Sequence, residues 1–97
     1  MNVILLPPAD LELQDAIDFY DGQMNGLGDR FYKCFLGTVH HIKGSPELWR
    51  KVGLNTRRIN ISGFPFLVLY IVDQENIFIT CVAHQHRDPL YYTNRLS

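Results

Sequence analysis

Side chains able to do chemistry gather within the dozen residues from His84 to Arg95. Arginine can hold a phosphate or a carboxylate in a fork, histidine can move protons near neutral pH, and tyrosine can stack or donate a hydrogen bond. These groups are costly to bury without partners. We therefore expect them at an exposed edge, just beyond the apolar run 77–83. The residues concerned are His84, His86, Arg87, Tyr91, Tyr92 and Arg95.

Metal-free cleavage of RNA is one reaction that such side chains can perform. It needs a base for the 2′-hydroxyl proton, a cation to stabilise the charge on the phosphate, and an acid for the leaving oxygen. His84 or His86 can serve as base or acid, and Arg58 and Arg87 can hold the phosphate. Tyr92 can stack on a nucleobase or donate a proton.

The same residues also have purely structural interpretations. Arg87 can pair with Asp88 or with an acidic helix, and Asp88-Pro89 is sufficient to start a helix. One of two successive helical positions usually faces inward, so Tyr91 or Tyr92 can simply close the core. The sequence leaves both interpretations open.

The sequence indicates no metal, no cofactor and no disulfide. His84 and His86 have no obvious third ligand, because Cys81 is expected to face the core. Cys34 and Cys81 both stand in apolar surroundings without metal-type spacing. Both are expected to be buried thiols in a reducing cytoplasm.

Length and composition favour one folded domain over residues 1–97, because 46% of the residues are hydrophobic and 20% are charged. No apolar run approaches the length of a membrane span. Residues 1–48 hold seven acids and three bases, whereas residues 49–97 hold three acids and six bases. We therefore expect the anion-attracting face in the C-terminal half of a cytoplasmic protein, although its pI near 6.4 argues against nucleic-acid binding by bulk charge.

Periodicity predicts the elements that must position the candidate residues. Apolar recurrence at helical spacing predicts a helix from Asp10 and a second helix from about Asp29, joined as a hairpin. Apolar or alternating runs predict strands at 3–6, 57–62, 66–72 and 77–84, and a short last helix from Pro89. In that helix Arg87, Tyr91 and Arg95 would form one row.

The predicted fold is an α+β domain with a helical hairpin packed on a mostly antiparallel four-stranded sheet. The other face of the sheet, or its concave end, would remain for polar work. We expect the guanidinium groups of two strands, Arg58 and Arg87, to converge there.

The chain resembles the RelE/ParE superfamily of toxins from type II toxin–antitoxin systems, often called plasmid-stabilisation proteins. The matching pieces run along the whole length, and their order is more specific than any one of them. They are Ala9-Asp10-Leu11 with 16–20, Gly26–Phe31, Pro46 with Trp49 and Val52, Arg57-Arg58, 64–66 with Tyr70, and Ala83–Pro89 with Tyr92 and Arg95.

The resemblance implies a RelE/ParE-like fold, an antitoxin that wraps and neutralises the chain, and one of three activities. ParE-like members inhibit DNA gyrase by binding, and the tyrosine-rich end after Arg87-Asp88-Pro89 is closer to that side. RelE-like members are ribosome-dependent mRNA endoribonucleases, but the lysines common in active ones are missing from the strands here. A non-toxic relative kept for complex formation, as a homodimer or a larger toxin–antitoxin assembly, is the third alternative.

The resemblance also implies two overlapping sets of site residues. The set for catalysis is Arg58, His84, His86, Arg87 and Tyr92. The set for binding a target or a phosphate is Arg57, Arg58, Arg87, Tyr91 and Arg95.

Overall fold

Two long helices and four strands form where the apolar pattern predicts them, in a computed structural model that describes all 97 residues. The strands are β1 (Asn2–Leu5), β2 (Thr56–Asn60), β3 (Phe66–Asp73) and β4 (Asn76–His84), and the helices are α1 (Ala9–Gln23) and α2 (Leu27–Gly44). The starts fall within two residues of the predicted positions. Apolar periodicity was therefore a sufficient guide to the main elements.

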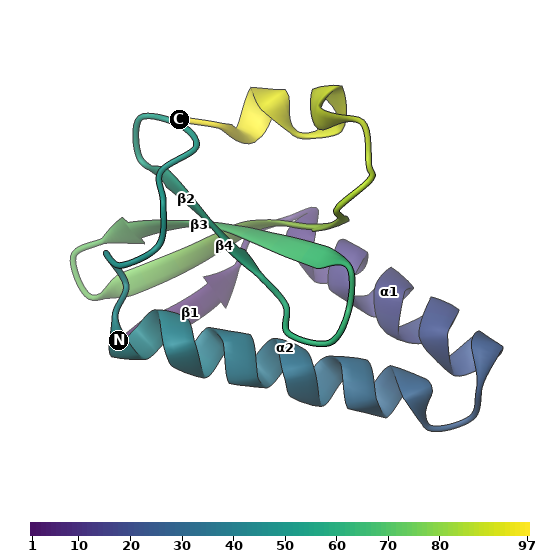
Figure 1. Ribbon diagram of the computed structural model, residues 1–97. Coiled ribbons are helices and arrows are strands. Elements are labelled where there is room, and N and C mark those ends of the chain that lie inside the picture. The colour runs from purple at the N-terminus through teal and green to yellow at the C-terminus, as the bar shows by residue number, and fades with distance from the viewer.

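The strands form one sheet in the order β1-β4-β3-β2. β3 pairs antiparallel with both β2 and β4, whereas β1 pairs with β4 in parallel. Figure 1 shows both helices on one side of this sheet, with the C-terminal end of the chain on the other. The predicted α+β fold is confirmed.

The face of the sheet covered by α1 and α2, here called the helix face, carries the main core. Its thirteen buried apolar residues come from both helices and three strands, and they include Phe31, Ile42 and Tyr70. The Phe31 ring stacks on Tyr20 with centroids 5.3 Å apart and meets Phe66 edge-on at 5.0 Å. Because each fully buried aromatic side chain contributes about 2 kcal/mol or more, this face supplies most of the stability.

The turn between the helices depends on close backbone approach. Gly26 precedes α2 with φ of 89°, a conformation that glycine adopts without strain. A Cβ at Gly28 would lie 2.5 Å from the Ile17 carbonyl oxygen, so only glycine lets the two helices meet there. Asp21 Oδ1 accepts hydrogen bonds from the backbone N–H groups of Gly26 (3.0 Å) and Gly28 (3.3 Å), which stabilises the start of α2.

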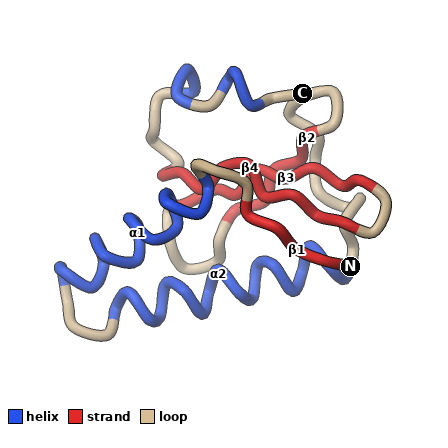
Figure 2. The backbone as a smooth tube through the Cα atoms, turned by 180° about the vertical axis from the view of Figure 1, so that it is seen from behind, coloured by secondary structure: helices blue, strands red, loops and turns tan.

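The opposite face of the sheet is covered by the C-terminal segment, residues 85–97, so the prediction of an open polar face is wrong. Tyr92 and Leu96 of this segment pack on a small cluster made of Leu67, Leu69, Cys81 and Ala83, together with Val52. We call this side the segment face. Figure 2, which views the molecule from behind, shows the segment crossing above the strands. β3 and β4 carry apolar side chains on both faces of the sheet, so this face must be covered as well.

The C-terminal segment forms two 3₁₀ turns, Pro89–Tyr91 and Thr93–Arg95, where a single short helix was predicted. Asp88 does cap the first turn, since its Oδ1 accepts from the Leu90 N–H at 3.0 Å. At its end the Ser97 carbonyl accepts hydrogen bonds from the backbone N–H groups of Asn55 and Thr56, which lead into β2. The segment is therefore attached to the sheet at both ends. None of the helices is long and apolar enough to cross a membrane.

Candidate functional site

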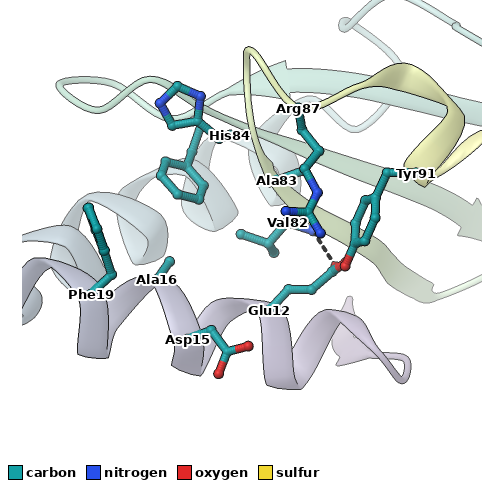
Figure 3. Close-up of a pocket in the computed structure, with 10 residues that line it drawn as sticks. Glu12, Asp15, Ala16, Phe19, Val82, Ala83, His84, Arg87 and Tyr91 are labelled. Carbon is teal, nitrogen blue, oxygen red and sulfur yellow. Dashed lines mark hydrogen bonds between the residues drawn. The ribbon is translucent and has the colours of Figure 1, made fainter.

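A surface pocket of about 220 Å³ lies between α1 and the end of β4, where the sequence placed its candidate residues. Figure 3 shows its walls: α1 below, the last residues of β4 behind, and the start of the C-terminal segment above. We call it the α1–β4 pocket. It is lined by Glu12, Asp15, Ala16, Phe19, Phe66, Val82, Ala83, His84, Arg87 and Tyr91.

The predicted row of Arg87, Tyr91 and Arg95 exists, although on 3₁₀ turns. The Arg87 guanidinium carbon lies 3.8 Å from the centre of the Tyr91 ring, and that of Arg95 lies 4.9 Å from it. Both cations are thus within the range in which an aromatic face attracts positive charge. We call these three residues the arginine–tyrosine row.

Glu12 of α1 binds this row from below. Its carboxylate accepts from Arg95 through two parallel hydrogen bonds of 2.8 Å and 3.0 Å, and the Tyr91 hydroxyl donates to the same group. Figure 3 shows the Tyr91 hydroxyl meeting the end of the Glu12 side chain. A fork of this kind is the strongest geometry for an arginine–carboxylate pair.

The edge of β4 explains why a carboxylate is needed at this point. β1 pairs with β4 only as far as Ile79, so the outer edge beyond it has no strand neighbour. The Val82 N–H on this edge donates to Glu12 Oε1 at 3.0 Å. At Thr80 the pairing of β4 with β3 shifts register, and the Thr80 carbonyl accepts from Arg95 at 2.9 Å. Glu12 and Arg95 thus satisfy backbone groups that a longer β1 would otherwise pair.

The ion pair is mostly shielded from water, with side-chain exposures of 15% for Arg95 and 9% for Glu12. Burial alone would raise the pKa of the Glu12 carboxyl, but the hydrogen bonds from Arg95, Tyr91 and Val82 outweigh it and leave the pKa below its usual value. The hydrogen bonds to Glu12 in turn raise the pKa of Arg95, against the effect of burial. Both groups stay charged at neutral pH.

The two histidines lie side by side, and His84 stands at the upper rim of the pocket. His84 is the last residue of β4, and its ring stands edge-on to Phe66 at 5.4 Å. The His86 ring lies 5.4 Å from that of His84, and the His86 N–H donates to His84 Nδ1 at 3.1 Å. His84 Nδ1 is therefore an acceptor for the protein backbone, and its other ring nitrogen remains available.

The remaining candidates lie elsewhere. Tyr92 packs on the segment face, so Tyr91 is the tyrosine that faces the pocket. Arg57 donates to the backbone carbonyls of Glu47 (3.0 Å) and Trp49 (2.8 Å) and so ties the preceding loop to β2. Arg58 donates to Asn60 and borders a different surface pocket with His41 and Arg50.

The expectation that Arg58 and Arg87 converge on an uncovered sheet face is therefore wrong. β3 lies between the strands that lead to them, and the C-terminal segment occupies the face between. Arg87 and Arg95 do come together, with Tyr91 between them. The structure leaves the functional roles of all these residues as predictions.

Sequence reasoning missed Glu12, which it counted only among the acids of the N-terminal half. A signal was present: Glu12 stands three residues after Ala9 and four before Ala16, both of which are buried. It therefore shares the inward face of α1, and an acid there needs a partner. Its partner Arg95 lies 83 residues away, and no local pattern joins the two.

One family model and two solved structures agree on the type of fold. A family model described as the ParE toxin of type II toxin–antitoxin system, parDE, matches residues 3–89. A chain from the chromosomal ParDE system of P. aeruginosa superposes with a TM-score of 0.63 at 16% identity, over 87% of this chain and 95% of that one. The isolated E. coli RelE toxin superposes with a TM-score of 0.66 at 16% identity, over 97% of this chain and 94% of that one.

No curated protein matches the chain by sequence. At 16% identity the two solved structures show the fold alone. The family model covers nearly the whole chain, including both helices, all four strands and the start of the C-terminal segment. The chain therefore belongs to the ParE toxin family of type II toxin–antitoxin systems.

Proposed function

We propose that the chain inhibits growth by binding DNA gyrase, as ParE-like toxins do, and that a cognate antitoxin neutralises it. The arginine–tyrosine row and the α1–β4 pocket would form the surface that meets the target. Arg87 and Tyr91 are the exposed members of the row, and they present a cation stacked on an aromatic ring. Arginine and tyrosine are the residues that most often dominate binding energy at interfaces.

The observation that carries this proposal is the pairing of the row with Glu12. A nuclease needs a free acid or base next to an unpaired cation. Here the Tyr91 hydroxyl and the Arg95 guanidinium are both engaged by one carboxylate. No lysine stands on β2, β3 or β4 to take their place. At Tyr91 and Arg95, this arrangement favours a rigid binding surface over a reacting centre.

A ribosome-dependent endoribonuclease is the second candidate, and one observation favours it. His84 and Arg87 line the same pocket, with one histidine nitrogen available. A histidine and an arginine side by side can supply a proton-transfer group and a phosphate clamp. Asp15, whose carboxylate also lines the pocket, would supply the second proton-transfer group.

Induction of the chain in cells without antitoxin separates these candidates. Binding to gyrase predicts growth arrest with a DNA-damage response and intact transcripts. Rapid cleavage of messenger RNA would reject gyrase as the target and support the nuclease. Normal growth at strong expression would reject both in favour of a non-toxic relative.

The groove of the helical hairpin is the proposed docking place for the antitoxin. It is a depression of about 530 Å³ with Leu13, Ile17 and Tyr32 on its floor and walls. Three carboxylates, Asp10, Asp21 and Asp29, border it. An amphipathic antitoxin helix with basic flanks would fit this combination of apolar floor and acidic rim.

Replacing an exposed residue of this groove tests the docking place. Tyr32 is 40% exposed, so Tyr32→Ala leaves the core intact while removing ring contacts from the groove. We expect the variant to stay toxic and to need a higher ratio of antitoxin for neutralisation, measured by titrating the small protein encoded by the adjacent gene. Unchanged neutralisation would place the antitoxin elsewhere. Size-exclusion chromatography with light scattering would separately give the assembly state of the toxin–antitoxin complex.

A further inference from the structure

The Glu12 carboxylate accepts hydrogen bonds from both the C-terminal segment and β4. It accepts from Arg95 twice, from the Tyr91 hydroxyl and from the Val82 N–H. One helical carboxylate thus links the arginine–tyrosine row to the edge of the sheet.

We propose that Glu12 is a positioning residue, which holds the arginine–tyrosine row in the arrangement that the toxin's target meets. The proposal rests on the toxin role proposed above, but it does not depend on which target the toxin has. Glu12 itself is mostly shielded, with 9% of its side chain exposed, so it acts through Arg95 and Tyr91 rather than by touching the target.

The weak apolar attachment of the segment is the first reason why a polar clamp is needed. Only Tyr92 and Leu96 of residues 85–97 pack on the buried cluster of the segment face. Leu90 is 77% exposed, and Arg87 and Tyr91 lie at the surface. A segment with so few buried apolar contacts opens easily unless specific bonds hold it.

The geometry of the clamp is the second reason. Arg95 also donates to the Thr80 carbonyl, so one side chain joins the segment, the bulge of β4 and helix α1. Both guanidinium groups contact the Tyr91 ring, so a shift of Arg95 would also disturb Tyr91 and, through it, Arg87. Loss of the carboxylate would therefore be felt at the exposed Arg87, which Glu12 does not bond.

The thiol of Cys81 is a built-in probe of this attachment. It is fully buried in the cluster that Tyr92 and Leu96 cover, so a thiol reagent reaches it only when the segment lifts. Because Glu12 also raises the pKa of this thiol, the rates are compared at a reagent concentration so high that opening of the segment, and not the reactivity of the thiol, limits labelling. The experiment uses the full chain with Cys34→Ala, so that Cys81 is the single thiol. The variant is Glu12→Gln, which keeps the shape of the side chain and removes its charge, and the control is Asp18→Asn, whose carboxylate contacts only Gln14 on the outside of α1.

We expect Glu12→Gln to raise the rate of Cys81 labelling by about tenfold or more, because it leaves the half-buried Arg95 cation without an anion. Asp18→Asn should label at the parent rate. Circular dichroism and the urea midpoint show whether each variant is folded. If Glu12→Gln proves unfolded, the double variant Glu12→Gln with Arg95→Gln, which leaves no unpaired buried charge, takes its place in the labelling experiment.

The functional readout is the dose of toxin that halves growth or target activity, compared with the maximum effect at saturation. Glu12→Gln keeps every group of the row, so we expect a higher half-effect dose with the same maximum effect. The dose is expressed as the concentration of folded protein, measured by circular dichroism. A merely structural role would leave this half-effect dose unchanged, because loss of folded protein only lowers the active concentration, and that result would overturn the proposal.

Two further outcomes separate this proposal from the proposed function. If the parent chain arrests growth without affecting gyrase, the gyrase assignment fails, while the same dose comparison still tests Glu12. Equal Cys81 labelling in parent and Glu12→Gln would overturn the positioning role whatever the target is.

Discussion

The two faces of the sheet are held by different kinds of interaction. The helix face buries thirteen apolar residues under two helices, with several aromatic rings in mutual contact. The segment face buries four residues under a segment of 3₁₀ turns. The attachment of this segment depends on Glu12, which binds Tyr91 and Arg95, and on the Ser97 carbonyl at its end. Apolar burial fixes the fold, whereas a few directional polar contacts fix the surface that we assign to target binding.

Such a division suits a protein whose working surface must stay defined without a large core beneath it. Loss of one apolar contact on the helix face should affect the whole domain. Loss of one polar contact on the segment face should affect the segment alone. Three variants and one labelling comparison test this difference, in order of decreasing effect.

The largest effect is expected for Phe31→Ala on the helix face. Phe31 is fully buried and contacts the rings of Tyr20, Phe64 and Phe66. The cavity left behind should lower the free energy of unfolding by about 3–5 kcal/mol. Urea denaturation followed by circular dichroism measures this, and a loss below about 1 kcal/mol would contradict the assignment of the main core.

An intermediate and local effect is expected for Thr56→Val under the segment face. The buried Thr56 hydroxyl accepts from the Ser97 N–H at 3.2 Å and donates to the Ser97 carbonyl at 3.4 Å. Its removal should favour local opening by about 1–2 kcal/mol. Hydrogen exchange should quicken at the Asn55 and Thr56 amides, which also bond Ser97, with α2 amides as the internal control. Equal acceleration in α2 would mean that the two faces are not independent.

A smaller effect is expected for Tyr70→Phe, at the margin of the helix face. The Tyr70 hydroxyl donates to the Pro46 carbonyl at 2.8 Å, so its loss should cost about 1 kcal/mol at neutral pH. Burial raises the pKa of Tyr70 to about 12, above the usual value of 10.0. The native state therefore favours the neutral phenol, and this stabilisation is complete below pH 10 and is lost as the pH rises toward 12.

The stability difference between parent and Tyr70→Phe should accordingly shrink or change sign between pH 8 and pH 11, as measured by urea midpoints. A difference that stays constant over this range would show that the phenol is not held neutral by burial.

The last prediction involves no change in stability and compares the reactivity of the two thiols. Burial raises the pKa of the Cys81 thiol to about 12, whereas Cys34 is partly exposed on α2. Since the thiolate is the reactive form, Cys34 should be labelled much faster than Cys81 by a thiol reagent at pH 8. Mass spectrometry of the labelled chain decides the order, and faster labelling of Cys81 would mean that the segment is open.

Sequence alone was sufficient for the elements and the fold, because periodicity in 66–72 and 77–84 and at helical spacing after Asp10 records which faces are buried. It also placed Arg87, Tyr91 and Arg95 in one row, since their spacing is local. It could not show that residues 85–97 return across the sheet, because the contacts of Tyr92 and Leu96 are with distant strands. The pairing of Glu12 with Arg95 escaped for the same reason, as did the register shift at Thr80 that supplies a carbonyl for Arg95.

Inhibition of purified DNA gyrase is the most direct measurement of the proposed role. Gyrase supercoils relaxed plasmid in the presence of the parent chain, of Arg87→Ala or of Arg30→Ala. Arg30→Ala is the control, because it removes an exposed arginine of α2 that lies far along the chain from the row. We predict that the parent and Arg30→Ala inhibit supercoiling at the same concentration. Arg87→Ala, although folded, should need a concentration at least about tenfold higher for the same inhibition. Full inhibition by Arg87→Ala, or none by the folded parent chain, would contradict the account.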